Sequence, residues 1–164
     1  MRTAVIDRTP LMCFVHLDFV RELSHFFDVI YVPRSVHMEV NRKGRFRYTL
    51  RKLYDAGLLH RCAAADRTNL DLRRLELGDG EAEALVQAQE RHADFFIGDD
   101  KRAREIAEAQ GLKPVGTVRI LARLELEGRA DKTKSLVKKL RTQFDFRVSD
   151  KIVTQAIAMA NEPL

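Results

Sequence analysis

The feature that most constrains this fold is the repeated alternation of short apolar runs with longer segments of helical periodicity. The runs TAVID (3–7), DVIYVP (28–33), ADFFIG (93–98) and KPVG (113–116) are typical of strands, and LLHRCAA (58–64) is either a weak strand or a loop. Short apolar strands that alternate with helices favour a parallel sheet covered on both faces. We therefore predict an α/β fold, a three-layer α/β/α sandwich around a short, mainly parallel sheet.

Helical periodicity separates and follows these runs. The predicted helices cover residues 10–27, 36–43, 45–57, 79–92 (with its start near Asp79 or Gly80), 99–111, 117–128, 131–144 and 149–160. Thr117 is expected to cap the helix that Gly128 ends. No repeat, low-complexity linker or change of composition divides the chain, so we predict one domain over residues 1–164.

The composition excludes several classes of protein. With 45% hydrophobic and 32% charged residues the chain resembles a globular domain, and no apolar stretch approaches the roughly 18 residues that span a bilayer. Cys13 and Cys62 form no CxxC pair, and the histidines show no HxxxH or HExxH spacing, which argues against a disulfide scaffold and a zinc enzyme. We expect a cytoplasmic protein without a membrane partner. The net charge of +5 suits an anionic partner, or serves solubility alone.

Acidic residues stand at the ends of the predicted strands. Asp7 ends the first strand, and Asp99 and Asp100 follow the strand at 93–98. Glu39 comes about two helical turns after the second strand, and Glu81 lies in the first turn of the helix before ADFFIG. Because the carboxyl ends of parallel strands share one edge of a sheet, these segments can direct their carboxylates into one cleft.

Such a cluster needs a positive partner, because carboxylates a few ångströms apart raise one another's pKa. Mg²⁺ or Mn²⁺ would serve, since both ions prefer oxygen ligands and share them with phosphates. Each acid also has an ordinary structural explanation. Asp99 could cap the helix that begins near Lys101, with Asp100 beside its positive end, and Glu81 suits a first helical turn. Glu39 could be a solvated helix residue and Asp7 a turn residue.

Several motifs together resemble the PIN-domain nucleases. They are AVIDRTPLM (4–12), DVIYVPRSVHMEV (28–40), LGDGEAEAL (77–85), FIGDDKRAREIAEAQGLKPVGTVRIL (96–121) and KTKSLVKKLRTQFDFRVSDKIV (132–153). The third and fourth are similar to the Gly-Glu-x-Glu-Ala helix start and the Asp-Asp run of one branch of this family. Their order and spacing carry the resemblance over nearly the whole chain.

This resemblance implies a PIN-like fold and a Mg²⁺- or Mn²⁺-dependent endoribonuclease, often the VapC-like toxin of a toxin–antitoxin pair. RNA, an antitoxin protein and a second copy of the chain are the implied partners. Matched by motif, Asp7, Glu39, Glu81 and Asp100 form the acidic quartet that holds the metal, and Asp99 shares or replaces the role of Asp100.

The resemblance also gives roles to residues around the quartet. Thr9 would orient Asp7 or touch phosphate, or it caps a helix that begins at Pro10, and Arg104 would support the site or lie on an outward-facing helix. The basic segment 41–53 interleaves cations with Phe46 and Tyr48, as single-stranded RNA binding requires. Its candidate RNA contacts are Arg42, Lys43, Arg45 and Arg47. The segment could instead bind an antitoxin or form a solvated helix face.

Two positions depart from the family pattern. Gly98 stands where many members carry a hydroxyl residue before the acids, and Arg8 is bulkier than the small residue often found beside the first Asp. These departures favour the alternative of a non-catalytic PIN-like module that binds RNA or protein. A phosphoacceptor receiver domain also gathers acids at strand ends, but it would place its acid pair after the first strand rather than after a late one.

Overall fold

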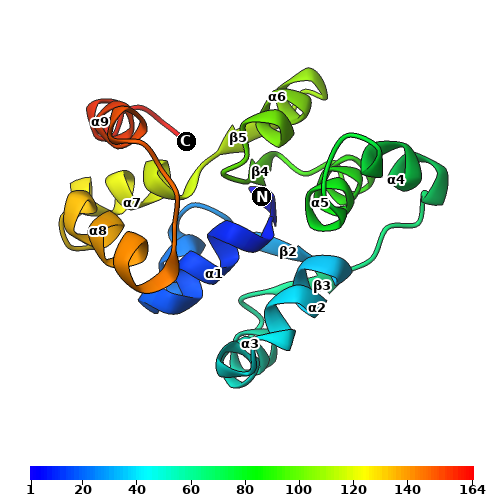
Figure 1. The fold of residues 1–164 in the computed structure, drawn as a ribbon, viewed down its shortest axis with the longest axis horizontal. Coiled ribbons are helices and arrows are strands. Elements are labelled where there is room, and N and C mark those ends of the chain that lie inside the picture. Colours follow the sequence, from blue (N-terminus) through cyan, green and yellow to red (C-terminus); the bar gives the residue numbers. More distant parts are fainter.

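The computed structural model describes residues 1–164 and contains one five-stranded sheet (Figure 1). Its strands are β1 (Thr3–Ile6), β2 (Val29–Pro33), β3 (His60–Cys62), β4 (Phe95–Ile97) and β5 (Lys113–Val115). They lie in the order β3-β2-β1-β4-β5, and every pairing is parallel. The predicted strands and the parallel sheet are confirmed, and the ambiguous run at 58–64 contains a strand.

Helices fill the connections between strands and the C-terminal third of the chain. They are α1 (Arg8–Leu17), α2 (Arg34–Arg42), α3 (Gly44–Asp55), α4 (Arg67–Arg74), α5 (Asp79–Glu90), α6 (Lys101–Ala109), α7 (Thr117–Leu126), α8 (Thr133–Phe144) and α9 (Asp150–Ala158), with a 3-10 helix, η1 (Arg21–His25), after α1.

Alternate strand residues face opposite sides of the sheet and build two separate cores. On one side, Ala4 and Ile6 join a cluster of 35 buried residues that includes side chains of α1, α3, α7, α8 and α9. On the other side, Val5 and Phe96 join a cluster of ten with side chains of α5 and α6. Figure 1 shows the sheet between these two groups of helices. The predicted three-layer α/β/α sandwich is confirmed.

The helix predicted over residues 10–27 is wrong in its length. Helix α1 begins earlier, at Arg8, and ends at Leu17, because Asp18 adopts a left-handed conformation with φ of 60°. The Asp18 backbone N–H donates to the carbonyl of Val15 at 3.2 Å, which closes the helix. A separate 3-10 helix follows, so the apolar period of the sequence continues across a real break.

Two further features of the helices differ from the sequence-based expectation. Helix α4 was not predicted; its start is fixed by Asp66, whose Oδ1 accepts a hydrogen bond from the Asn69 backbone N–H at 2.9 Å. Thr117 does not cap α7, because Gly116 occupies the N-cap position and Thr117 is the first helical residue. The Thr117 side chain is therefore available to another element.

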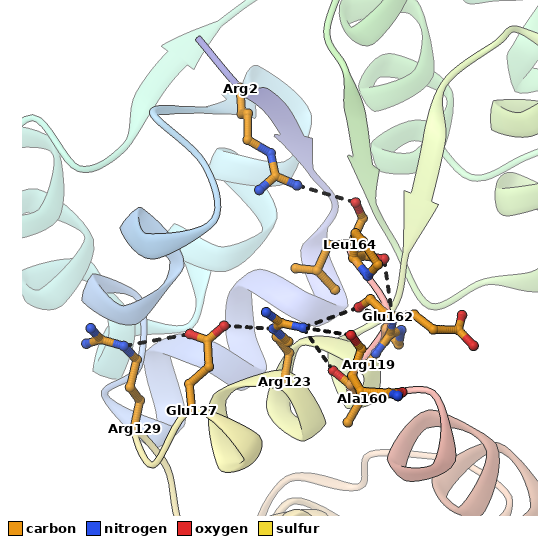
Figure 2. Close-up of polar contacts among 10 residues, drawn as sticks. Arg2, Arg119, Arg123, Glu127, Arg129, Ala160, Glu162 and Leu164 are labelled. Atoms are coloured by element: carbon orange, nitrogen blue, oxygen red, sulfur yellow. Dashed lines mark hydrogen bonds and ion pairs between the residues drawn. The ribbon is translucent and has the colours of Figure 1, made fainter.

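Arginines hold the C-terminal residues against α7 and the start of the chain (Figure 2). Arg123 donates from Nη1 to the carbonyl of Ala160 at 3.2 Å, and Arg119 donates from Nη2 to the carbonyl of Glu162 at 2.8 Å. Arg2 donates to the carbonyl of Leu164 at 3.3 Å. These contacts satisfy backbone acceptors that follow the last helix, and so fix the tail beside the edge strand β5.

The strand order separates this fold from a receiver domain, whose doubly wound sheet follows the order 2-1-3-4-5. Here β1 is the central strand. It pairs with β2 on one side and with β4, which comes much later in the chain, on the other. The order reverses between β1 and β4, where ligands of open α/β sheets usually bind. No helix in the structure is long and apolar enough to cross a membrane.

Candidate functional site

The acids at the ends of β1 and β4 lie side by side. Ile6 pairs with Ile97 in the parallel register, and the Asp7 backbone N–H donates to the Ile97 carbonyl at 2.9 Å. Asp7 and the adjacent pair Asp99 and Asp100 therefore leave neighbouring strands at the same edge, at the point where the strand order reverses. The structure brings together the acids on which the predicted site depends.

Glu39 joins this cluster from α2, with Gly80 marking the point of contact. A β-carbon built on Gly80 would lie 3.4 Å from Oε1 of Glu39 and 3.5 Å from Oδ1 of Asp7. Two carboxylates from different elements thus face the same small space above the first turn of α5. The missing side chain at Gly80 keeps that space open.

The Asp7 carboxyl has the most unusual environment of the group. Its residue is 5% exposed, and no side chain donates a hydrogen bond to it. Burial raises the pKa of Asp7 to about 7; the Arg8 backbone N–H opposes this rise, and the charges of Glu81 and Asp99 add to it. A nearby cation would stabilise the ionised form of this carboxyl, because it would offset the free energy lost by burying the negative charge.

Glu81 and Asp100 act as helix caps as well as members of the cluster. Oε2 of Glu81 accepts from the Gly78 backbone N–H at 3.2 Å, and Oδ1 of Asp100 accepts from the Ala103 backbone N–H at 2.8 Å. Burial raises the pKa of Glu81, the Gly78 N–H opposes the rise, and the nearby Asp100 charge strengthens it. Each carboxylate uses one oxygen in its cap, so its second oxygen remains available to a ligand.

Asp99 accepts its hydrogen bonds from α7 and not from α6, the helix that follows it in the chain. Its Oδ1 accepts from the Thr117 backbone N–H at 2.8 Å, and its Oδ2 accepts from the Thr117 hydroxyl at 2.6 Å. Burial raises the pKa of Asp99, while these two hydrogen bonds and the charge of Arg104 oppose the rise. The expectation that Asp99 caps the helix after it is wrong, because Asp100 occupies that position.

The missing hydroxyl at Gly98 has a packing explanation. A β-carbon on Gly98 would collide with the ring of Phe96, and Phe96 is completely buried. Any side chain at this position would displace that ring from the core. The Thr117 hydroxyl instead reaches Asp99 from α7, so a hydroxyl does support the acid pair, although it comes from another element.

Arg8 turns toward the cluster instead of away from it. Its Nη1 lies 3.2 Å from Oε2 of Glu39, and its side chain is half exposed. The other oxygen of Glu39 faces Asp7 and the Gly80 space. The bulk of Arg8 therefore does not fill the site; it places a cation at its edge.

The remaining predicted residues have different positions. Thr9 lies in the first turn of α1 and does not cap it, because Asp7 holds the N-cap position; its hydroxyl makes no hydrogen bond to Asp7. Arg104 acts on Asp99 through its charge, and both residues line a cavity of about 420 Å³ beside α9. Four cations of the basic segment, the candidate RNA contacts, are exposed and form no ion pairs: Arg42, Lys43, Arg45 and Arg47. The segment starts at the end of α2, the helix that carries Glu39.

Sequence reasoning missed three supporting residues. Thr117 holds Asp99, Gly80 opens the space between Asp7 and Glu39, and the buried Glu83 accepts from the backbone N–H groups of Ser35 at 2.7 Å and Ala64 at 3.3 Å. Glu83 thereby fixes the start of α2, and with it Glu39, against α5. Glu83 lies in the same EAE run as Glu81, but only the tertiary structure separates an anchor from a site residue.

The donor set fits a hard divalent ion. All its members are carboxylates, the ligands that Mg²⁺ and Mn²⁺ prefer, and the buried Asp7 forms no ion pair of its own. In the present side-chain arrangement, no three acids, histidines or cysteines lie close enough to form a ready-made chelating group. Binding of an ion would therefore require the side chains around Gly80 to draw together.

Comparison with known proteins agrees with the fold and the motifs. A family model described as a PIN domain matches residues 3–162. A PilT N-terminus domain protein from the hyperthermophilic archaeon Sulfolobus solfataricus P2 has a similar structure, with a TM-score of 0.56 and 18% sequence identity over 73% of this chain and 91% of that chain. At this identity the likeness concerns the fold. No curated protein is significantly similar in sequence.

Proposed function

Since this chain belongs to the PIN-domain family, whose members are generally nucleases, we propose that it is a divalent-metal-dependent endoribonuclease. One observation carries the proposal: the buried Asp7 and the partly exposed Glu39 direct carboxylate oxygens to within 3.5 Å of a single point, the position of a β-carbon built on Gly80. Grouping like charges around a small open space costs stability, which is typical of sites kept for function rather than for folding.

The proposed ligands of Mg²⁺ or Mn²⁺ are Asp7, Glu39, Glu81 and Asp100, and Asp99 stands next to them as a further acid. A bound ion of this kind lowers the pKa of water and offsets charge on a phosphate group. Of the acid pair, Asp100 has one oxygen that its helix cap leaves free, whereas both oxygens of Asp99 accept hydrogen bonds from Thr117. We therefore assign the ligand role to Asp100 and a positioning role to Asp99.

The basic segment supports RNA as the substrate class. Tyr48 is 68% exposed, and Nζ of Lys52 lies 4.4 Å from the centroid of its ring, so a cation and an aromatic face share one exposed surface. Such surfaces bind single strands through phosphate contacts and stacking. We propose that this surface holds the RNA on one side of the acid cluster.

Cleavage of a single-stranded RNA in Mn²⁺ or Mg²⁺ tests the proposal. We expect activity that EDTA abolishes and that falls on the order of a thousandfold in Asp7→Asn, because loss of a charged ligand weakens binding of the ion that would offset charge in the transition state. Asp94→Asn is the matched control, since Asp94 lies at the opposite end of the strands and its carboxylate accepts hydrogen bonds only from Thr3. Cleavage that persists undiminished in Asp7→Asn would contradict the proposed site.

The toxin role is a finer proposal that the Gly-Glu-x-Glu-Ala resemblance supports. Its test is growth arrest on induced expression, relieved both by Asp7→Asn and by co-expression of a small protein encoded next to this chain. An RNA-binding module without catalysis is the second candidate, because the Arg8–Glu39 pair already neutralises part of the cluster without a metal. Tight RNA binding without cleavage in Mn²⁺ would favour that candidate.

A further inference from the structure

Arg8 is the one side-chain cation that forms an ion pair with the acid cluster. Glu81 and Asp100 take their hydrogen bonds from backbone N–H groups, and Asp99 takes its own from Thr117. Arg8 alone contributes a positive charge at ion-pair distance, 3.2 Å from Oε2 of Glu39. It also follows Asp7 directly, at the first position of α1.

The geometry of Glu39 divides the site into an inner and an outer side. Oε1 of Glu39 faces the Gly80 space and Asp7, whereas Oε2 faces Arg8. The Arg8 side chain is 50% exposed, against 31% for Glu39. The guanidinium thus lies at the entrance of the cluster, between the inner carboxylates and solvent.

A structural ion pair would not need this placement. Exposed ion pairs contribute little to stability, typically less than about 1 kcal/mol. The Arg8 guanidinium has about five N–H donors in a planar fork, and one of its nitrogens is engaged with Glu39. The remaining donors have the geometry that binds phosphate oxygens in a bidentate manner.

We propose that Arg8 is a substrate-binding residue, whose guanidinium, held at the entrance by Glu39, binds a phosphate of the RNA while it weakens divalent-ion binding through the same carboxylate. This inference rests on the proposed function, because it assigns the substrate phosphate and the ion to the outer and inner sides of one cluster. It also gives a role to the residue whose bulk departs from the family pattern.

The proposal predicts opposite effects on two ligands. In Arg8→Ser, we expect Mn²⁺ to bind about three- to tenfold more tightly, because Glu39 loses a competing cation. RNA should bind about tenfold more weakly, because a charge-assisted phosphate contact is lost. The slope of log affinity against log salt should fall by about 0.7, the contribution of one phosphate contact on a single strand. Arg8→Lys should retain the salt slope but recover only part of the affinity.

Isothermal titration calorimetry with Mn²⁺ alone measures the first effect. Fluorescence anisotropy of a labelled single-stranded RNA in Ca²⁺ measures the second, with the RNA checked for integrity afterwards. Arg21→Ser is the matched control, because Arg21 is exposed, forms no ion pair and lies in η1, which leads into the amino end of β2. It removes the same charge and should change neither measurement.

Two results would overturn the proposal. If Arg8→Ser weakens both Mn²⁺ and RNA binding, Arg8 only positions Glu39; if the salt slope is unchanged, Arg8 touches no phosphate. Neither readout needs cleavage, so the two proposals fail separately. Suppose that Arg8→Ser strengthens Mn²⁺ binding and weakens RNA binding, but the wild type does not cleave RNA: the role of Arg8 is then upheld and the nuclease proposal is rejected. If the wild type cleaves RNA but Arg8→Ser leaves the salt slope unchanged, the nuclease proposal stands and the role of Arg8 is rejected.

Discussion

Acids at the two ends of the sheet have opposite surroundings. At the amino end, Asp28 accepts a hydrogen bond from the Arg2 backbone N–H, and Asp94 accepts from both the backbone N–H and the hydroxyl of Thr3, at 2.8 Å and 3.1 Å. These donors lower the pKa of Asp94. At the carboxyl end, burial and mutual repulsion raise the pKa of Asp7 instead.

The difference separates acids that stabilise the fold from acids that the fold tolerates. Asp94 joins the start of β1 to the start of β4 and gains from its charge. Asp7 occupies the equivalent place at the other end of the same two strands, and its charge is disfavoured. If both acids served only the fold, both would have enough hydrogen-bond donors to offset their burial, whereas the one backbone donor of Asp7, the Arg8 N–H, does not offset it. The following predictions test this contrast.

The largest expected effect is on the pH dependence of the free energy of unfolding, to which Asp7 at the carboxyl end and Asp94 at the amino end should contribute with opposite signs. Burial raises the pKa of Asp7 in the folded state to about 7, above the ordinary value of 3.8, so the folded state binds the proton more tightly than the unfolded state does. Relative to Asp7→Asn, the wild type should therefore lose stability as pH rises from about 4 to 7, by an amount on the order of 4 kcal/mol without metal. Chemical denaturation at a series of pH values measures this difference.

The control for this experiment is Asp94→Asn. The folded pKa of Asp94 is lowered, so its contribution is present above the unfolded pKa and is lost as pH falls through the folded value. The wild type should thus gain stability relative to Asp94→Asn as pH rises through the carboxyl range. Parallel slopes for the two variants would refute the contrast between the two ends.

Binding of a metal ion should restore the stability that ionised Asp7 costs, and it should do so only at the carboxyl end of the sheet. At a Mn²⁺ concentration about a hundred times its dissociation constant, the wild type should gain about 2.7 kcal/mol. Asp7→Asn should gain little of this, while Asp94→Asn should gain all of it. Thermal unfolding with and without Mn²⁺ provides the measurement, and an equal gain in all three proteins would place the ion elsewhere.

At the amino end, Asp94→Asn should cost about 1 kcal/mol at neutral pH, because it weakens charge-assisted hydrogen bonds to Thr3. RNA cleavage should be unchanged. Denaturant unfolding measures the loss, and Thr3→Val, which removes only the hydroxyl contact, should give a smaller one. If Asp94→Asn cleaves RNA more slowly although the variant is fully folded, the amino and carboxyl ends of the sheet are coupled.

The smallest change in stability is expected for Gly80→Ala. The new methyl group would make ordinary contacts of 3.4–3.5 Å with Glu39 and Asp7, and alanine suits a helix better than glycine by up to about 1 kcal/mol. Stability should change by a few tenths of a kcal/mol, yet Mn²⁺ should bind more weakly because the methyl group occupies the space between the carboxylates. Unaltered Mn²⁺ affinity by calorimetry would show that the ion does not use this space.

Local periodicity was enough to predict the layers of this fold. The β-branched runs at 3–7 and 28–33 and the apolar run at 93–98 all became parallel strands. The strand-end acids were recognisable for the same reason, since residues that follow parallel strands share an edge of the sheet. The break after α1 could not be read from periodicity, because a left-handed Asp18 interrupts the helix without interrupting the apolar pattern. The spacing of Asp99 and Asp100 could not show which of them caps α6.

The sequence by itself determined that an α/β sheet would carry acids at its carboxyl edge, because strand and helix periods and strand-end positions are local properties. Only the tertiary structure decided how those acids are used. It supplied Thr117 to Asp99 from 18 residues away, placed Gly80 between Asp7 and Glu39, and turned Arg8 into a partner of the cluster. These are contacts between distant segments, and their distances depend on how whole helices pack on the sheet.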